Sequence, residues 1–292
     1  NDSRFAYDSY RRLITMYADV VMETDEAENY SGKKIRSIFD NELEKIKSKK
    51  KYKLDTDLNT DDLKFLCSKY KQIIKKEFKQ EFPDNVEIQL WNTIQAVFSS
   101  WNCKRAKQYR KIENISNRMG TAVNIQSMVF GNSGKKSATG VAFTRNPSNG
   151  DNIFYGEWLE NAQGEDVVAG IRTPNPINNA SQLTSYVKQI SLENKYPSIY
   201  KKLYSIKNKL ENHYKDMQDI EFTIENGVLW MLQTRSGKRN GVAAIKIALD
   251  LLYNNVIDEK TVIKRITDHH LNEIMLPIID PEEEKNAKII AR

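Results

Sequence analysis

The sequence lacks any long apolar run. None of its 292 residues falls in a stretch that approaches the roughly 20 apolar residues a membrane-spanning helix requires. Its start, NDSRFAYDSYRR, is polar at once and lacks the pattern of a secretory signal peptide. We therefore expect a soluble globular protein with no membrane partner. The start also lacks methionine and the end has no stop pattern, so we expect an excised piece of a longer protein.

Cysteine and histidine are scarce. Cys67 and Cys103 lie far apart, outside any CxxC pattern, which argues against a disulfide framework or a zinc site. Cys67 falls on the apolar stripe of a predicted helix, so we expect a buried thiol. His213, His269 and His270 form no HExxH motif and receive no catalytic role. This cysteine usage fits a reducing compartment, and we expect a cytoplasmic protein.

The chain carries only a modest excess of positive charge. The net charge is +6 and the pI about 9, which raises the question of a nucleic-acid partner. The basic residues, however, cluster in Lys45–Lys53 and Lys69–Gln80, where the apolar residues have helical periodicity. These lysines are typical of the solvated faces of helices, so we expect no nucleic-acid partner.

The chain changes texture near Gly120. Before it, apolar residues recur at three and four positions and predict helices; after it, β-rich segments alternate with polar loops. We predict an α+β fold with a mainly antiparallel sheet, divided into a helical subdomain (1–100), an α+β subdomain (101–240) and C-terminal helices that begin a linker (241–292). The expected strands are 121–131, 141–147, 153–159 and a hairpin within 217–239, and the expected later helices are 199–217, 242–253 and 258–266. The prolines of 171–177 exclude a central strand there, and DPEEEKNAK (280–288) has the composition of a linker.

The hairpin carries an unusual set of polar side chains. In DIEFTI, Asp219 and Glu221 share one face, and in VLWMLQTR, Gln233 and Arg235 share another with Leu229 and Met231. A two-residue Asn-Gly turn would pair Glu221 with Leu232 and put the two polar sets on opposite faces. A three-residue loop, Glu225–Gly227, pairs Ile224 with Val228, so that Asp219 faces Gln233 and Glu221 faces Met231. We predict the three-residue loop.

A face with acids, an amide and a guanidinium suits a metal–nucleotide site. Carboxylate and amide oxygens are ligands for Mg²⁺, so Glu221 and Gln233 are the predicted metal ligands. Arg235 offers a planar fork to a phosphoryl group. Leu229 and Met231 would form an apolar floor near the nucleoside. The alternative is a salt-bridged solvent face on an ordinary hairpin.

Three further segments offer weaker candidates. The loop NSGKKSATG (132–140) has the glycines and lysines of a phosphate-binding loop but does not match a P-loop. In 156–170, Glu157 and Glu165 could support a metal or orient an arginine, although a turn and a helix cap explain the same residues. Gln126, followed by Met128 and Val129, could approach an adenine edge, although polar strand residues usually face water.

These segments together resemble one known family. The sequences GTAVNIQSMVFGN, GVAFTRNPSNG, NAQGEDVVAGIRTP and MQDIEFTIENGVLWMLQTRSGKR, with RFAYDSYRRLITMYADVVM near the start, are similar in order and content to pyruvate, phosphate dikinase. The resemblance covers nearly the whole chain and is closer than that to phosphoenolpyruvate synthase.

The resemblance implies an ATP-grasp nucleotide-binding domain that binds ATP and Mg²⁺. In the family, the histidine of a mobile domain attacks the β-phosphorus of ATP and AMP leaves. Inorganic phosphate then removes the γ-phosphoryl group as pyrophosphate, and a further domain passes the remaining phosphoryl group to pyruvate, giving phosphoenolpyruvate. Carried onto this chain, Asp219, Glu221, Gln233 and Arg235 resemble the phosphate- and metal-handling residues, and Glu157 and Glu165 resemble supporting acids. The family also implies a dimeric parent.

The chain departs from the family pattern at both ends. The glycine-rich segment with a lysine, a further arginine, and the phosphohistidine and pyruvate-binding parts have no match here. We expect this chain alone to bind ATP weakly and to be inactive, because the cations that neutralise the phosphates are lacking. Two rivals remain: a helical protein-interaction module on a β scaffold, and a related dikinase such as phosphoenolpyruvate synthase.

Overall fold

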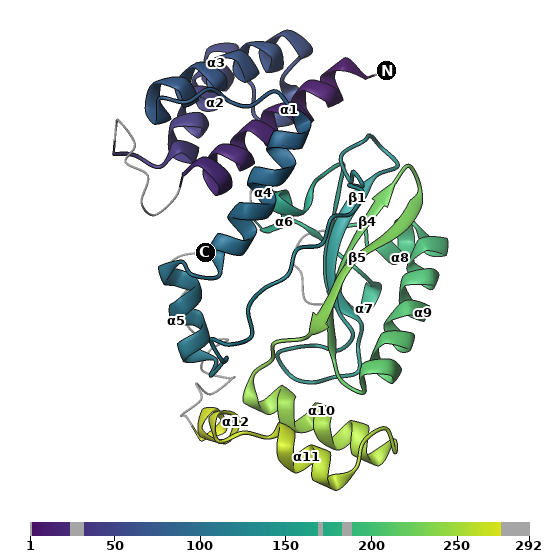
Figure 1. The fold of residues 1–292 in the computed structure, drawn as a ribbon. Helices are drawn as coiled ribbons and strands as arrows, with labels where there is room; N and C mark the ends of the chain where they lie inside the picture. The colour runs from purple at the N-terminus through teal and green to yellow at the C-terminus, as the bar shows by residue number, and fades with distance from the viewer. Residues whose placement is uncertain (1, 24–31, 169–171, 183–188, 276–292) are drawn as a thin grey trace, which may run out of the picture. The chain divides into compact units, whose positions relative to one another are not determined.

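The computed structural model describes residues 2–23, 32–168, 172–182 and 189–275 (Figure 1). The chain separates into two compact units, which we call the N-terminal unit (Asn1–Gln126) and the C-terminal unit (Ser127–Arg292). The mixed helical and antiparallel architecture confirms the predicted α+β class. The finer boundaries expected after residues 100 and 240 stay predictions.

The N-terminal unit is helical, as predicted. Its elements are α1 (Ser3–Tyr17), η1 (Ala18–Met22), α2 (Ile35–Lys50), η2 (Asp55–Asp57), α3 (Thr60–Phe78), α4 (Val86–Ser100) and α5 (Lys104–Ile112). The apolar stripes of α1, α2 and α3 meet in one core that includes Ile14, Phe39 and Tyr70. The Tyr70 ring stacks on Phe39 with centroids 4.2 Å apart, and its hydroxyl donates to the Phe39 carbonyl. Helical periodicity in the sequence therefore located the core of this unit.

The C-terminal unit is built around one antiparallel sheet in the order β3-β2-β1-β4-β5. The strands are β1 (Ala138–Phe143), β2 (Tyr155–Glu160), β3 (Asn175–Pro176), β4 (Gln218–Glu225) and β5 (Val228–Ser236), with the short helices α6 (Gly164–Val168), α7 (Asn179–Gln182) and α8 (Leu192–Lys195) between them. The long helix α9 (Pro197–Tyr214) lies along one face of the sheet (Figure 1). On this face, three side chains of β4 pack against three side chains of α8 and α9. Those of β4 are Ile220, Phe222 and Ile224, and those of the helices are Leu192, Ile199 and Leu203. The opposite face of β4 carries its polar side chains.

Three C-terminal helices complete the unit. They are α10 (Gly241–Tyr253), α11 (Glu259–Arg265) and α12 (Asp268–Ile274), close to the bounds predicted for the first two. A separate cluster joins α10 to the start of β4 through Ile247, Leu251 and Met217. Among the described residues, no helix combines the length and the apolar character needed to cross a bilayer. The expected linker at 280–288 lies outside the described residues.

The strand predicted at 121–131 is wrong. Residues 121–130 form neither strand nor helix, and Ile125 and Met128 are 68% and 64% exposed. The alternating apolar pattern is only a preference, since a strand also needs a neighbour that takes up its backbone hydrogen bonds. The other strand predictions are confirmed in kind, and β3, which contains Pro176, is an edge strand as the prolines require.

A substitution at Gly140 on β1 can test how tightly the sheet packs on Phe222. A Cβ atom at this position would lie 2.5 Å from Phe222 Cζ and 2.7 Å from the Glu157 carbonyl oxygen. We expect Gly140→Ala to lower the free energy of unfolding by about 1–3 kcal/mol or more, because strands must move apart. Gly164→Ala, where nothing lies within 4 Å, is the matched control and should change it little. Equal stability of the two variants in urea unfolding would contradict this packing.

The reactivity of the Cys67 thiol can be used to test whether the core of the N-terminal unit is closed. Burial raises the pKa of its thiol to about 11, so that at pH 8 only about one thiol in a thousand is ionised. Because the thiolate is the reactive form, we expect a thiol reagent to modify the partly exposed Cys103 well before Cys67. Mass spectrometry of the partly labelled native chain measures this order, and a urea-unfolded sample, in which both react, is the control. Early labelling of Cys67 would show that the core is open.

Candidate functional site

The candidate site is carried by the hairpin of β4 and β5, and its turn has two residues. Glu225 pairs with Val228, and the residues between them, Asn226 and Gly227, have φ angles of 50° and 82°. Positive φ at both central positions is the geometry that Asn-Gly favours in a tight hairpin. The three-residue loop predicted from the sequence is therefore wrong.

A β-bulge further along β5 restores the arrangement that the longer loop was expected to give. Met231 pairs with Phe222, but the next pair is Gln233 with Glu221, so Leu232 is an extra residue without a partner on β4. An extra residue shifts the alternation of side chains by one position. Glu221 consequently faces Gln233 rather than Met231. The remaining pairs toward the end of β5 are offset by the same one residue.

The shifted phase brings both polar sets to one face. Asp219 pairs with Arg235 rather than with Gln233, and both lie on the same side of the sheet as Glu221. The predicted shared face exists, but its pairings differ from those predicted. Leu229 and Met231 pair with Ile224 and Phe222 on the opposite face. They form no apolar floor beside the acids, which corrects that prediction.

Glu157 belongs to the same row of the sheet. Its partner on β1 is Val141, and the partner of Val141 on β4 is Glu221, which in turn faces Gln233. With neighbouring strands about 4.8 Å apart, the Cα atoms of Glu157 and Glu221 are separated by about 10 Å. Glu157 is exposed whereas the next residue, Trp158, is 1% exposed on the α9 side. The row therefore presents two carboxylates and an amide to one surface.

Arg235 is held by the two acids of β4. Its Nε donates to Asp219 Oδ2 at 2.7 Å, and its Nη2 lies 3.8 Å from Glu221 Oε1. The Asp219 side chain is 11% exposed and that of Arg235 is 60% exposed, so the carboxylate is a buried anchor for an accessible guanidinium. Glu221, at 38%, and the exposed Gln233 lie beside this pair.

The donor set decides which ion the row could take. Within the described part of the chain, no three acidic, histidine or cysteine side chains gather as a ready-made metal cage. One carboxylate and one amide oxygen, from Glu221 and Gln233, fit Mg²⁺, which usually keeps water and phosphate oxygens as its remaining ligands. The residues therefore fit a magnesium ion that arrives with a phosphate compound, and do not fit a structural zinc site.

Glu165 lies toward the turn end of the sheet and outside the row. It sits on α6, whose preceding residues are tied to the segment before β1 by Asn161 N–H to Ser137 O and Ala162 N–H to Gly131 O. The hairpin tip meets the same segment, where Gly227 N–H donates to Lys136 O. The lysine loop, Asn132–Gly140 in the sequence, thus lies at the turn end, and Glu165 with it.

Gln126, Met128 and Val129 lie where the N-terminal unit ends and the C-terminal unit begins. Gln126 is exposed and belongs to the N-terminal unit, and Met128 is exposed at the start of the C-terminal unit. Only the following residue, Phe130, is fixed near the hairpin, by its N–H to Glu225 Oε1 at 3.1 Å. Contact of these three residues with a nucleotide stays a prediction.

Sequence reasoning missed Trp230. It pairs with Thr223, on the face of Asp219 and Glu221, and is 46% exposed. The signal was present, since a tryptophan on an exposed strand position is uncommon. The three-residue loop, however, assigned Trp230 to the buried face.

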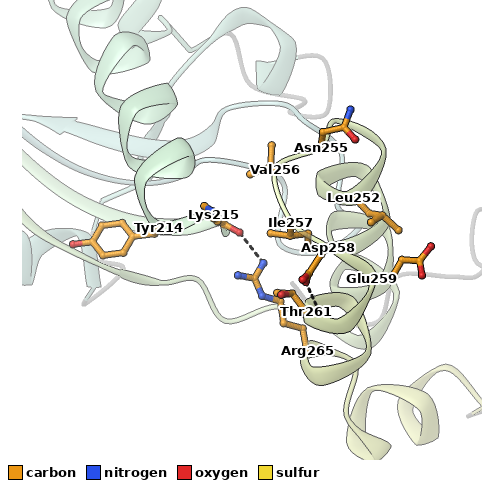
Figure 2. A pocket seen from close by; sticks show the side chains of 10 residues that line it. All are labelled: Tyr214, Lys215, Leu252, Asn255, Val256, Ile257, Asp258, Glu259, Thr261 and Arg265. Carbon is orange, nitrogen blue, oxygen red and sulfur yellow. Dashed lines mark hydrogen bonds between the residues drawn. The ribbon is translucent and has the colours of Figure 1, made fainter.

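A hollow of about 620 Å³ lies elsewhere, where the end of α9 meets α10 and α11 (Figure 2). None of the predicted site residues lines it. Two hydrogen bonds join residues of its lining: Arg265 Nη1 donates to the Lys215 carbonyl and Thr261 N–H donates to Asp258 Oδ1. Shape alone would select this hollow, but the chemistry gathers on the open sheet face.

The asymmetry of the Asp219–Arg235 pair can be measured. Arg235→Ala leaves the Asp219 carboxylate buried without this partner, so we expect a loss of about 1–3 kcal/mol in the free energy of unfolding. Asp219→Asn in the same background removes the stranded charge and should recover part of the loss. Urea unfolding of the two single variants and the double variant gives the coupling. Strictly additive effects would show that the pair does not interact.

Comparisons with known proteins show which family the chain resembles. A model of the family described as "Pyruvate phosphate dikinase, AMP/ATP-binding domain" matches residues 53–202 and 184–252. Pyruvate, phosphate dikinase of Rhizobium meliloti (strain 1021) is 48% identical over 285 residues, which is 98% of this chain and 31% of that protein. The enzyme of Clostridium symbiosum is 46% identical over 98% of this chain and 30% of its own length. The chloroplastic enzyme of Flaveria trinervia is 45% identical over 99% of this chain and 28% of its own.

The chain thus spans less than a third of the length of these relatives. The family match, in contrast, extends over most of the chain and includes the complete sheet with its hairpin. The chain belongs to the pyruvate phosphate dikinase AMP/ATP-binding domain family.

Proposed function

We propose that this chain forms part of the ATP-binding domain of a pyruvate, phosphate dikinase. Such an enzyme converts ATP, phosphate and pyruvate to AMP, pyrophosphate and phosphoenolpyruvate. The observation that carries the proposal is the row of Glu157, Glu221 and Gln233 next to the anchored Arg235, in a chain of the AMP/ATP-binding family. The relatives favour this function over the interaction module and over phosphoenolpyruvate synthase.

Glu221 and Gln233 would hold Mg²⁺ between them and the nucleotide phosphates. Each offers an oxygen from its own strand, and the two residues are direct cross-strand partners. A bound magnesium ion offsets the negative charge on the phosphate oxygens. Glu157 lies on the far side of Val141 in the same row, where it would bind a second ion or orient a cation of the nucleotide-binding surface.

Arg235 would contact the phosphoryl group. A guanidinium presents several N–H donors in one plane, and one of them is used by Asp219. Asp219 would act through Arg235, fixing its direction before the nucleotide binds and lowering the reorganisation that binding requires. Glu165, Gln126, Met128 and Val129 are assigned to the surrounding nucleotide contacts on the resemblance alone.

The remaining parts of the proposal concern the whole protein. We propose that its own phosphohistidine domain takes the phosphoryl group, that pyruvate is the final acceptor, and that the parent is a dimer. We place it in the cytoplasm, which suits its two free cysteines. The weak ATP binding expected of this chain alone stays a prediction.

In the full-length protein, the two halves of the reaction can be assayed separately, as AMP formation from ATP and as exchange between pyruvate and phosphoenolpyruvate. Glu221→Ala removes a proposed metal ligand, so we expect AMP formation from ATP to fall at least a hundredfold. Exchange between pyruvate and phosphoenolpyruvate should continue, because that chemistry belongs to another domain. The exposed acid Glu259 on α11 provides the matched control, and Glu259→Ala should leave both activities intact.

Two outcomes would contradict the assignment. Normal AMP formation in Glu221→Ala would remove Glu221 from the metal site. Loss of both activities would count against the assignment, because Glu221 would then not serve the ATP half-reaction alone. Omission of inorganic phosphate distinguishes the related dikinases, because only a phosphate-dependent enzyme then stops forming AMP and pyrophosphate.

A further inference from the structure

Trp230 lies on the polar face of the hairpin, and the proposed function gives this aromatic side chain no role. It is 46% exposed on β5, which is an edge strand of the sheet. Its cross-strand neighbour Thr223 and the next residue across, Thr139, are both buried and short, with hydroxyls 3.4 Å apart. Trp230 keeps nearly half of its surface exposed beside these buried hydroxyls. A half-exposed tryptophan beside charged groups offers a flat apolar surface to a ligand.

Three successive rows of the hairpin give this face a direction. Asp219 and Arg235 form the first row, Glu221 and Gln233 the second, and Thr223 and Trp230 the third. Along β4, each row is two residues from the next, a rise of about 6.8 Å. A cation, a metal-binding pair and an aromatic surface therefore follow one another along the strands.

The order of the rows matches the order of groups in a nucleoside triphosphate. The terminal phosphates need the guanidinium and the metal, and the base needs a flat apolar partner. We propose that a purine base stacks on Trp230 while the triphosphate runs along β5 toward Arg235. This inference rests on the nucleotide site proposed above and adds the direction of the nucleotide and the residue that selects for its base.

The other tryptophans make the prediction specific. Trp158 is 1% exposed on the opposite face of the sheet, against α8 and α9. Trp91 and Trp101 belong to the N-terminal unit. Met231, the next residue on β5, points to the opposite face and is 37% exposed. Met231→Ala is therefore a matched control, an exposed apolar truncation one position away.

The test compares a ligand that has a base with one that has none. In the full-length protein, we expect Trp230→Ala to weaken Mg·ATP binding about tenfold, in line with the loss of one base–aromatic stack. Binding of magnesium tripolyphosphate should be unchanged, because it touches only the first two rows. Trp230→Phe should keep most of the ATP affinity, and Met231→Ala should bind both ligands normally. Titration calorimetry measures all of these affinities.

Fluorescence supplies a second readout. ATP should quench the tryptophan emission of the natural protein more strongly than tripolyphosphate does, and Trp230→Phe should lose this difference. Normal ATP affinity in Trp230→Ala, or an equal loss for ATP and tripolyphosphate, would overturn the stacking role while leaving the metal row in place. Failure of the natural protein to bind either ligand would overturn the nucleotide site, and the stacking role with it.

Discussion

Leu232 has no partner on β4, and the placement of Gln233 and Arg235 on the face of the acids depends on that extra residue. The Asn226–Gly227 turn alone would place Leu232 opposite Glu221 and send Gln233 to the face packed on α9. The bulge takes up one residue and returns the amide and the guanidinium to the side of the acids. A bulge is tolerated here because β5 is an edge strand with no ladder to disturb on its outer side.

The opposite face of β4 keeps this arrangement from slipping. Ile220, Phe222 and Ile224 are fully buried against α8 and α9, and a shift of one residue would replace them by two acids and a threonine. The cost of burying unpaired carboxylates exceeds what the hairpin could gain from any other pairing. The apolar core thus fixes β4, and the bulge adjusts β5 to it. The same alternation on β2 buries Trp158 and leaves Glu157 in the exposed row.

Local patterns predicted the long helices, four of the strands and the face of Asp219 and Glu221, because each depends on the periodicity of a single segment. The shorter helices α5 and α12 were not predicted. The turn and the bulge could not be separated in the same way. A three-residue loop and a two-residue loop with a bulge both bring the polar sets together. Asn-Gly favours the two-residue turn, but nothing in the sequence reveals the bulge that must accompany it. The strand predicted at 121–131 failed for a related reason, since alternation shows only that a segment could pair. Trp230 was missed because its face depends on the same undetermined register.

The Asp219–Arg235 pair joins a buried carboxylate, which holds the guanidinium in place, to an exposed guanidinium. Asp219 accepts from Arg235 Nε at 2.7 Å, and the Arg235 side chain is 60% exposed although its partner is buried. Glu221 lies 3.8 Å from Arg235, too far for a close hydrogen bond, so its oxygens remain available to an ion. Had Glu221 taken the place of Asp219 as the close partner, the same residues would form a plain salt bridge with little left for a ligand. The pairing that the bulge sets, rather than the residue types alone, therefore separates a binding surface from an ordinary charged hairpin.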